Sequence, residues 1–415
     1  MNNFFKVLHK SSHLHQGYGG QAKSKARLGE IDSDHGNMKT PGFISAATKG
    51  TIKTLTPQQI KDIGIQGACV NTYHLVTHPG TDVIERAGGI QKYSGLNIFT
   101  MSDSGGFQVF SLAREQRKAN VRGEEQPLVV KISEDGVKFR SSFDGELIEF
   151  TPERSMEFQR QIGADINMAF DECTYYPSTH KYAEKAMERT HRWLKRCIKY
   201  VGAQFIAPKN KGLINQTPTR KQYLYGVIQG GTFEDLRKKS AEFVVSQNTP
   251  GVAIGGVSVG ETKKEMREQV KWVSDYLPKD RPVHLLGVGQ IDDIIDLVKY
   301  GVDTFDCVEP TRLARMGTLY KISNIKSQIT NKYQIINNKI QNEEINITKT
   351  IYRNNFEKVD EDCNCYVCQN FTKSYLHHLF KQREILGYTL ATFHNLWVME
   401  KLFEEIREMI VKDLI

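Results

Sequence analysis

Three cysteines near the end of the chain have the spacing of metal ligands. They form a C-x-C-x2-C pattern and are Cys363, Cys365 and Cys368. Three thiolates and one imidazole complete a tetrahedral zinc site with no open position, and such a site is structural. We expect His394 to be the fourth ligand, because a helical stretch after the cysteines can return it; His377 and His378 within that stretch are competitors. A closed zinc does no chemistry, so the chemistry has to come from other residues.

Acidic and amide side chains follow several apolar runs of the sequence. The polar positions and glycines at these points are Asp103, Asp171, Gln229, Gly255, Gly256 and Asp306. Carboxylates without a catalytic metal cluster suit acid–base work or displacement at a sugar carbon, where one carboxylate attacks and another group handles protons. A carboxylate that accepts two N–H bonds also reads the edge of a guanine-like base.

Two aspartates of the stretch "VDTFDCVEPTR" have different expected roles. Asp303 and Asp306 are an odd number of positions apart, so a strand places them on opposite faces. Asp306 lies nearer the carboxyl end of this strand and is the better functional candidate. We expect Asp303 to cap or to form an ion pair.

The elements that position these residues alternate between short apolar runs and helical stretches. The alternation is clearest over residues 225–308 and recurs earlier, in "GADINMAFDE" and in "ACVNTYHL" with their helical neighbours. At least six such units favour an α/β fold, a (β/α)8 TIM barrel, over an open doubly wound sheet. No G-x-G-x-x-G follows a first strand, which argues against dinucleotide binding. In a barrel, residues at the carboxyl ends of the strands form the mouth of the active site.

Composition narrows the class of protein further. The chain has 415 residues, seven cysteines and a net charge of +8, with no apolar run long enough to span a membrane and no secretory signal. We therefore expect a cytoplasmic, reducing location and no membrane partner. Residues 311–340 carry six Lys and Arg and no Asp or Glu, which is a weak indication of a polyanionic partner or else a solvated basic loop.

The predicted organisation has two parts. Residues 1–355 form the catalytic barrel with an N-terminal extension, and residues 356–415 form the zinc-binding subdomain and C-terminal helices. Three stretches of the first part read as additions to the barrel, and we expect none of them to carry chemistry. They are residues 12–22, 114–130 and 322–355.

Motifs spread over residues 26–412 resemble those of one known family, the tRNA-guanine transglycosylases or queuine tRNA-ribosyltransferases of bacterial type. The stretches that carry the resemblance include "ARLGEI", "NTYHL", "DSGGFQVFSL", "FDEC", "GVIQGG", "AIGGVSVGE", "HLLGVG", "GVDTFDCVEPTR" and "FHN". The resemblance implies a pentosyltransferase with a zinc-binding subdomain. It would exchange guanine 34 of tRNAs with G-U-N anticodons (the Asp, Asn, His and Tyr isoacceptors) for a 7-deazaguanine base, in queuosine biosynthesis.

The resemblance also implies roles for particular residues. Asp306 matches a nucleophile that forms a covalent RNA intermediate, and Asp103 matches the residue that transfers protons. The implied base-binding residues are Asp103, Ser104, Gly105, Gly106, Phe107, Asp171, Gln229, Gly256, Val257 and Leu286. The implied RNA-contacting residues are Gly287, Val288, Gly289, Gln290, Ile291, Asp292, Asp293, Thr311, Arg312, Leu313, Ala314 and Arg315. Cys363, Cys365, Cys368 and His394 match the zinc ligands.

Gln290 departs from the family pattern: many relatives carry Lys there, so one phosphate or base contact of the RNA is expected to be weaker. Two other positions, Cys173 after "FDE" and Val259, bear on substrate choice and are of bacterial type. Val259 occupies a site where the queuine-using eukaryotic enzymes have Gly, which predicts preference for the compact base preQ1.

Family members typically act as homodimers. Phe371, Tyr375 and His378 fall at i, i+4 and i+7 and would present a dimer face, unless this stripe packs on the chain's own barrel.

Three other functions stay open at this stage. An archaeosine-type relative would usually carry further RNA-binding domains after the barrel. A non-catalytic tRNA-binding partner subunit would have lost the acids that are present here as Asp103 and Asp306. A glycosidase acting on free nucleosides would leave the basic stretch and the zinc site unexplained.

Overall fold

Eight parallel strands close into a barrel at the centre of the molecule. The computed structural model describes residues 4–17, 20–107, 128–141, 143–206, 221–322 and 344–415. The strands pair in the order β12-β13-β14-β15-β16-β6-β7-β8, and every neighbouring pair is parallel. Their bounds are β6 Gly42–Ala46, β7 Gly67–Val70, β8 Phe99–Ser102, β12 Ile166–Met168, β13 Tyr223–Ile228, β14 Gly251–Ile254, β15 Val283–Leu285 and β16 Thr304–Cys307. The predicted TIM barrel is confirmed.

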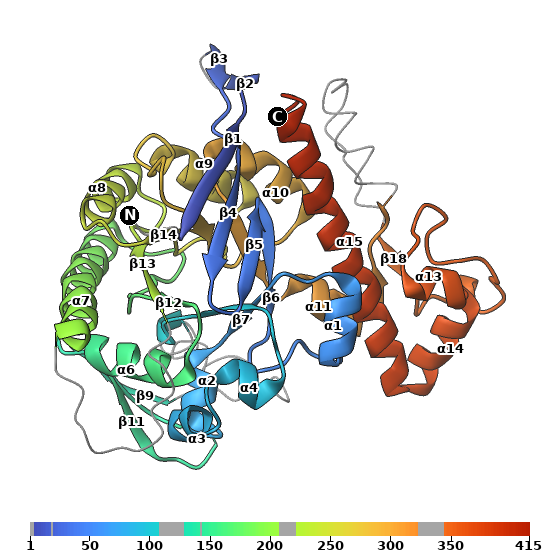
Figure 1. Cartoon of the computed structure of the whole chain (residues 1–415), viewed down its shortest axis with the longest axis horizontal. Coiled ribbons are helices and arrows are strands. Elements are labelled where there is room, and N and C mark those ends of the chain that lie inside the picture. Colours follow the sequence, from blue (N-terminus) through green and yellow to red (C-terminus); the bar gives the residue numbers. More distant parts are fainter. Residues whose placement is uncertain (1–3, 18–19, 108–127, 142, 207–220, 323–343) are drawn as a thin grey trace.

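Helices surround the barrel (Figure 1). After the first strands come α1 Pro57–Ile63, α2 Thr72–Thr77, α3 Thr81–Arg86 and α4 Ile90–Ser94. The later units carry α6 Pro152–Ile162, α7 His180–Ile206, α8 Glu234–Ser246, α9 Lys263–Val273, α10 Ile291–Leu297, η1 Val298–Tyr300 and α11 Glu309–Arg315. Helices α7 and α8 lie on the side of the barrel opposite α13 Tyr366–Asn370 and α14 Lys373–Gln382.

Local sequence signals explain where these helices begin and end. Thr151 caps α6 by accepting from the Arg154 N–H, Pro152 occupies its first turn, and Gly163 ends it. In α9, the Thr262 side chain and the Glu265 side chain each accept from the other's backbone N–H. Such ends fix the helices relative to the strands they follow.

Small sheets and further elements decorate the barrel. A three-stranded sheet is formed by β1 Phe5–Lys10, β4 Arg27–Ser33 and β5 Gly36–Thr40, and another by β9 Leu128–Ile132, β10 Val137–Arg140 and β11 Leu147–Phe150. Two strand pairs are β2 Leu14–Gly17 with β3 Gly20–Lys23, and β17 Thr318–Leu319 with β18 Ile345–Asn346. A short η2 Thr350–Tyr352 precedes the cysteines, and α15 Ile385–Val411 ends the fold.

The predicted additions to the barrel have different outcomes. Within the first region, 12–22, residues 14–17 form β2 and residues 20–22 form most of β3, which ends one residue beyond the region; the two strands make a hairpin. Residues 114–127 and 323–343 lie outside the described residues. Residues 128–130, expected as loop, instead begin strand β9, where Leu128 pairs with Arg140. The end of the third region contains β18 and η2.

The barrel interior is apolar except near one end. Inward side chains form a buried cluster that includes Ile44, Met101, Met168, Val227 and Ala253. His284 and Thr304 are also fully enclosed, and they are polar. Polar groups inside an apolar core need hydrogen-bond partners, and His284 and Thr304 provide them for each other.

Among the described residues, no helix is both long enough and apolar enough to cross a membrane.

Candidate active site and metal cluster

The predicted acids lie at the carboxyl ends of three barrel strands. Asp103 follows β8, Asp171 lies three residues beyond β12, and Asp306 is the third residue of β16. Gln229 follows β13, and Leu286 follows β15. Since the strands are parallel, these ends meet at one mouth of the barrel.

Asp103 is held by neutral donors from the neighbouring strand end. Its Oδ1 accepts from the Thr72 N–H at 2.8 Å and from the Gly105 N–H at 3.1 Å, and Asn71 Nδ2 donates to Oδ2. Burial raises the pKa of Asp103 to about 7; the two backbone N–H groups oppose this shift, and the charges of Asp306 and Asp171 add to it. A carboxyl group with this pKa can take and return a proton near neutral pH.

Asp171 and Gln229 form a buried pair beside Ser104. Asp171 accepts from Ser104 Oγ at 2.8 Å and from Gln229 Nε2 at 2.7 Å. Burial raises the pKa of Asp171, although both hydrogen bonds lower it. Gln229 Oε1 is buried and has no hydrogen-bond partner among the described residues. An amide that is only half satisfied leaves one polar group for a ligand.

The backbone of Gly255 and Gly256, called the glycine wall below, lies next to this amide. Gly256 has φ +62°, and a Cβ there would lie 2.2 Å from Gln229 Oε1, so only glycine is tolerated. The fully buried Arg237 supports the wall from behind by donating to the carbonyl oxygens of Gly231, Gly255 and Gly256. Val257 is buried, and Leu286 packs against the inner cluster of the barrel.

Asp306 is half-buried, as Asp103 is, whereas Asp171 is buried. The Oδ1 of Asp306 accepts from the Gly287 N–H at 3.0 Å and lies 3.1 Å from His284 Nε2. Phe107, predicted to stack on a base, is 47% exposed at the same mouth.

The predicted RNA-contacting segments are the β15–α10 turn and helix α11. Within the first, Val288 and Ile291 are buried, and Gln290 Nε2 donates to Glu309 Oε1 at 2.9 Å. Asp292 and Asp293 form ion pairs with Lys263 and Arg267. In α11, Arg312 is exposed, whereas Arg315 Nη1 donates to the Thr311 carbonyl.

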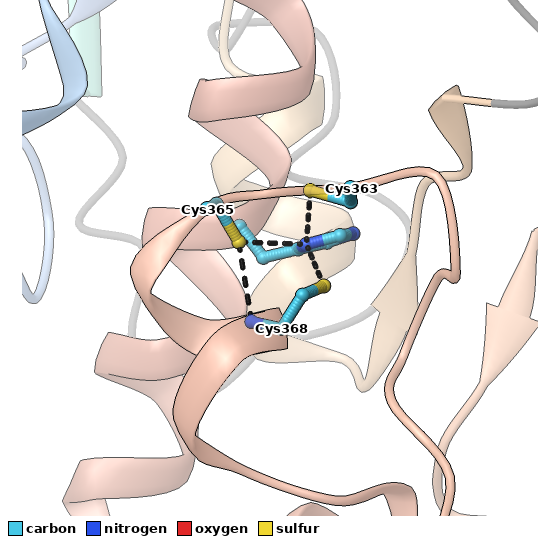
Figure 2. Close-up of side chains that lie close together, drawn as sticks. Cys363, Cys365 and Cys368 are labelled. Carbon is cyan, nitrogen blue, oxygen red and sulfur yellow. Dashed lines mark hydrogen bonds between the residues drawn. The ribbon is translucent and has the colours of Figure 1, made fainter.

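The four predicted metal ligands lie together and are buried. The ligand atoms of Cys363, Cys365, Cys368 and His394 all lie within 4.8 Å of one another. His394 Nδ1 is 3.8, 3.5 and 3.5 Å from the three sulfurs (Figure 2). The other ring nitrogen, Nε2, contacts the Tyr320 carbonyl at 2.8 Å, so Nε2 carries the proton and Nδ1 offers its lone pair to a metal.

The competing histidines are placed elsewhere. His377 Nδ1 contacts the Ile347 carbonyl at 2.8 Å, and His378 is exposed. The prediction that His394 completes the cluster is confirmed, because its ring lies with the three cysteines in the arrangement of a metal site.

Comparison with known proteins agrees with this geometry. The family described as Queuine tRNA-ribosyltransferase matches residues 22–415. The chain belongs to the queuine tRNA-ribosyltransferase family. It is 43% identical to the queuine tRNA-ribosyltransferase of Caldanaerobacter subterraneus over 392 residues, which cover 94% of this chain and 92% of the relative. The corresponding protein of Herpetosiphon aurantiacus is 39% identical over 413 residues, covering 100% of this chain and 90% of the relative. Members of this family are pentosyltransferases, and so is this chain.

Several residues that hold the site in place were not predicted from the sequence. Asn71 and Thr72 hold Asp103, and they were recognisable only as part of the motif "NTYHL" directly after a strand. Arg237 lies in a helix and its role needs the folded structure. His284 stands in an apolar run, where a lone histidine reads as an ordinary core residue.

Proposed function

We propose that this chain exchanges guanine 34 in tRNAs with G-U-N anticodons for a 7-deazaguanine base. The observation that supports it best is the grouping of Asp103, Asp171 and Asp306 at one barrel mouth beside the half-satisfied amide of Gln229. The free amide oxygen of Gln229 and the Asp171 carboxylate offer acceptors for the N–H groups on the edge of a guanine-like base. We propose a cytoplasmic location, because the proposed substrate is tRNA.

The reaction proceeds in two displacements at C1′ of nucleotide 34. In the first, the Asp306 carboxylate forms a bond to C1′ while the bond to guanine N9 breaks and its electron pair leaves with the base. In the second, Asp103 takes the N9 proton of the incoming base, and N9 displaces Asp306 from C1′. The pKa of about 7 suits Asp103 to this transfer.

Denaturing gel electrophoresis tests this proposal. Wild type and Asp306→Asn are mixed with an anticodon stem-loop containing U-G-U, and with a matched stem-loop containing U-A-U. We expect a shifted covalent band only for wild type with U-G-U, together with exchange of radiolabelled guanine into that RNA. No band and no exchange would contradict the function and favour a non-catalytic tRNA-binding subunit.

We propose that preQ1 is the preferred incoming base. Val259 is half-buried, and its N–H donates to Glu261 Oε2 at 2.8 Å, so the backbone of Val259 is held three residues beyond Gly256. A valine there favours a compact aminomethyl group over the larger cyclopentenediol of queuine. Comparable kcat/KM for both bases would contradict this preference.

We propose that the cysteine cluster holds one structural zinc ion. Tetrahedral zinc with ordinary bond lengths separates a sulfur from a nitrogen ligand by about 3.6 Å, close to the 3.5–3.8 Å separations of this cluster. The ion would fix Cys363, Cys365 and Cys368 to helix α15. Elemental analysis should find one zinc per chain, and Cys365→Ala should lose it; another metal in its place would overturn the assignment.

We propose a homodimer formed through the face around α14. Tyr375 and His378 are exposed, and the Phe371 ring stacks on the Tyr375 ring at 5.5 Å, while Phe371 itself packs in part against the chain's own core. The two exposed side chains support a dimer face at this helix. Further exposed apolar side chains nearby are Ile351, Phe356, Tyr366, Ile385 and Leu386. Sedimentation at micromolar concentration should show a dimer that Tyr375→Glu disrupts; a monomeric wild type would contradict this assembly.

A further inference from the structure

His284 lies between two side chains of the neighbouring strand. In the parallel pair of β15 and β16, His284 is opposite Thr304, and Asp306 follows two residues later on the same inner face. The imidazole is completely buried; its Nδ1 is 2.9 Å from Thr304 Oγ1, and its Nε2 is 3.1 Å from Asp306 Oδ1. One ring therefore connects a buried hydroxyl to a carboxylate at the mouth.

The chemistry of the partners fixes the direction of these hydrogen bonds. A carboxylate only accepts, so His284 Nε2 carries a proton and donates to Asp306. In the neutral ring Nδ1 is then an acceptor, and the Thr304 hydroxyl donates to it. Thr304 thereby selects the tautomer that serves Asp306.

A second donor acts on the same carboxylate oxygen. The Gly287 N–H reaches Asp306 Oδ1 at 3.0 Å from a turn in which Gly287 has φ +75°, a conformation that favours glycine. Among the described residues, every hydrogen bond to this carboxylate falls on Oδ1. Oδ2 is the oxygen left to react.

We propose that His284 is a positioning residue for the nucleophile. Together with Gly287 it holds Oδ1 and so orients Oδ2 toward C1′, and it transfers no proton. When the incoming base breaks the bond between C1′ and Oδ2, the electron pair returns to the carboxylate, and the donors on Oδ1 stabilise that charge. The proposal rests on Asp306 being the nucleophile, as proposed above.

Three variants separate positioning from simple packing. His284→Phe keeps the ring but removes the donor, His284→Gln keeps a donor near Nε2, and Thr304→Val removes only the hydroxyl. Rates of covalent adduct formation are measured in single turnover with saturating U-G-U stem-loop, alongside the KM for RNA.

We expect His284→Phe to lower the adduct rate roughly 10²-fold, the scale of losing one preorganised donor or of misplacing a reacting group. KM for RNA should stay within about threefold, because the RNA surface is unchanged. His284→Gln should recover most of the rate. Thr304→Val should lower the adduct rate less than His284→Phe does. The double variant should react at the same rate as His284→Phe, since Thr304 acts only through His284.

The outcomes distinguish this inference from the proposed function. If wild type forms no adduct and exchanges no guanine, the proposed function and the role of His284 are both contradicted. If wild type is active but His284→Phe reacts at the wild-type rate, or His284→Gln is as slow as His284→Phe, only the role of His284 is overturned. Should His284→Phe fail to fold, a wild-type rate in Thr304→Val would show that the Thr304 hydroxyl does not set the His284 tautomer, and it would overturn the positioning role of His284.

Discussion

At the amino-terminal end of the barrel the buried Asp303 meets a full positive charge, whereas the hydrogen-bond donors that Asp103 and Asp171 meet at the opposite end, among the described residues, are all neutral. Arg27 binds Asp303 through two nitrogens, at 2.8 and 2.6 Å, and the Val283 N–H adds a third bond. Asp103 has backbone N–H groups and an asparagine, and Asp171 has a serine and a glutamine.

The difference shows how one fold uses the same side chain for two purposes. A cation such as Arg27 balances the charge of the buried carboxylate beside it, so this ion pair has a structural role. Neutral donors compensate it only in part, so burial raises the pKa of Asp103 to about 7 and leaves that group ready for a proton. The stable end of the barrel and its reactive end are thus distinguished by the partners of their acids.

The largest expected effect comes from breaking the ion pair between Arg27 and Asp303 at the amino-terminal end of the barrel. Asp303→Asn leaves Arg27 buried beside a neutral group, and we expect the free energy of unfolding to fall by about 3–5 kcal/mol. Base exchange by the folded protein should stay near wild type, because Asp303 lies away from the mouth. Urea denaturation and exchange assays at 25 °C check both parts.

Asp306→Asn is the matched control for that experiment. It should abolish exchange while the unfolding free energy stays within about 1 kcal/mol of wild type, because the Asn side-chain oxygen can still accept the bond from Gly287. Equal stability losses in the two variants would remove the distinction between the ends.

The second prediction concerns pH at the reactive end. The carboxyl group of Asp103 has a folded-state pKa of about 7, above the ordinary 3.8, so between these values the folded protein holds a proton that the unfolded chain has lost. This group therefore stabilises the fold less and less as pH rises from about 4 to 7, by up to about 4 kcal/mol in total. Wild type should lose stability relative to Asp103→Asn over this interval in urea titrations.

Base incorporation should change with pH in the opposite sense. Asp103 must be ionised to take the N9 proton, so the wild-type rate should fall about tenfold per pH unit below 7. A flat stability difference together with a flat rate profile would show that Asp103 does not titrate near neutrality.

The smallest effect is expected from disturbing the neutral donor of Asp171. In Gly256→Ala the new Cβ would lie 2.2 Å from Gln229 Oε1 and displace the amide. We expect KM for the free base to rise about 10–100-fold, equivalent to 1–3 kcal/mol for a lost polar contact, while RNA binding is unchanged. Gly145→Ala, at a glycine with equally positive φ and open space around it, controls for backbone strain; a similar KM increase there would refute the specific contact.

The sequence predicted the acids well because their positions follow from topology. Strand alternation put Asp303 and Asp306 on opposite faces, and the nearness of Asp306 to the carboxyl end of the strand favoured it as the functional acid. Asp303 was expected to cap or to form an ion pair, and its ion pair with Arg27 confirms this. The supporting groups were not predictable in this way. Asn71, Arg237 and His284 contact their partners through strand neighbours or helix packing, and those distances exist only after the chain has closed.

The cluster ligands were predictable in part for a similar reason. Close spacing identified the three cysteines, and the helical stretch after them favoured His394 as the fourth ligand. Only the structure shows that His377 is engaged elsewhere, at the Ile347 carbonyl. The roles of Asp292 and Asp293 toward RNA stay predictions, and their pairing with Lys263 and Arg267 depends on how α9 packs against α10.

Helix α15 has a consequence for how the protein is made. It follows all eight barrel strands in the sequence, it carries His394, and it packs against β6, the first barrel strand, as well as α1 and α11. A ribosome that has already synthesised all eight strands therefore still holds a nascent chain whose first strand is uncovered and whose three cysteines lack their histidine. We expect such chains to depend on chaperones until synthesis is complete, and expression stopped before α15 should yield insoluble protein.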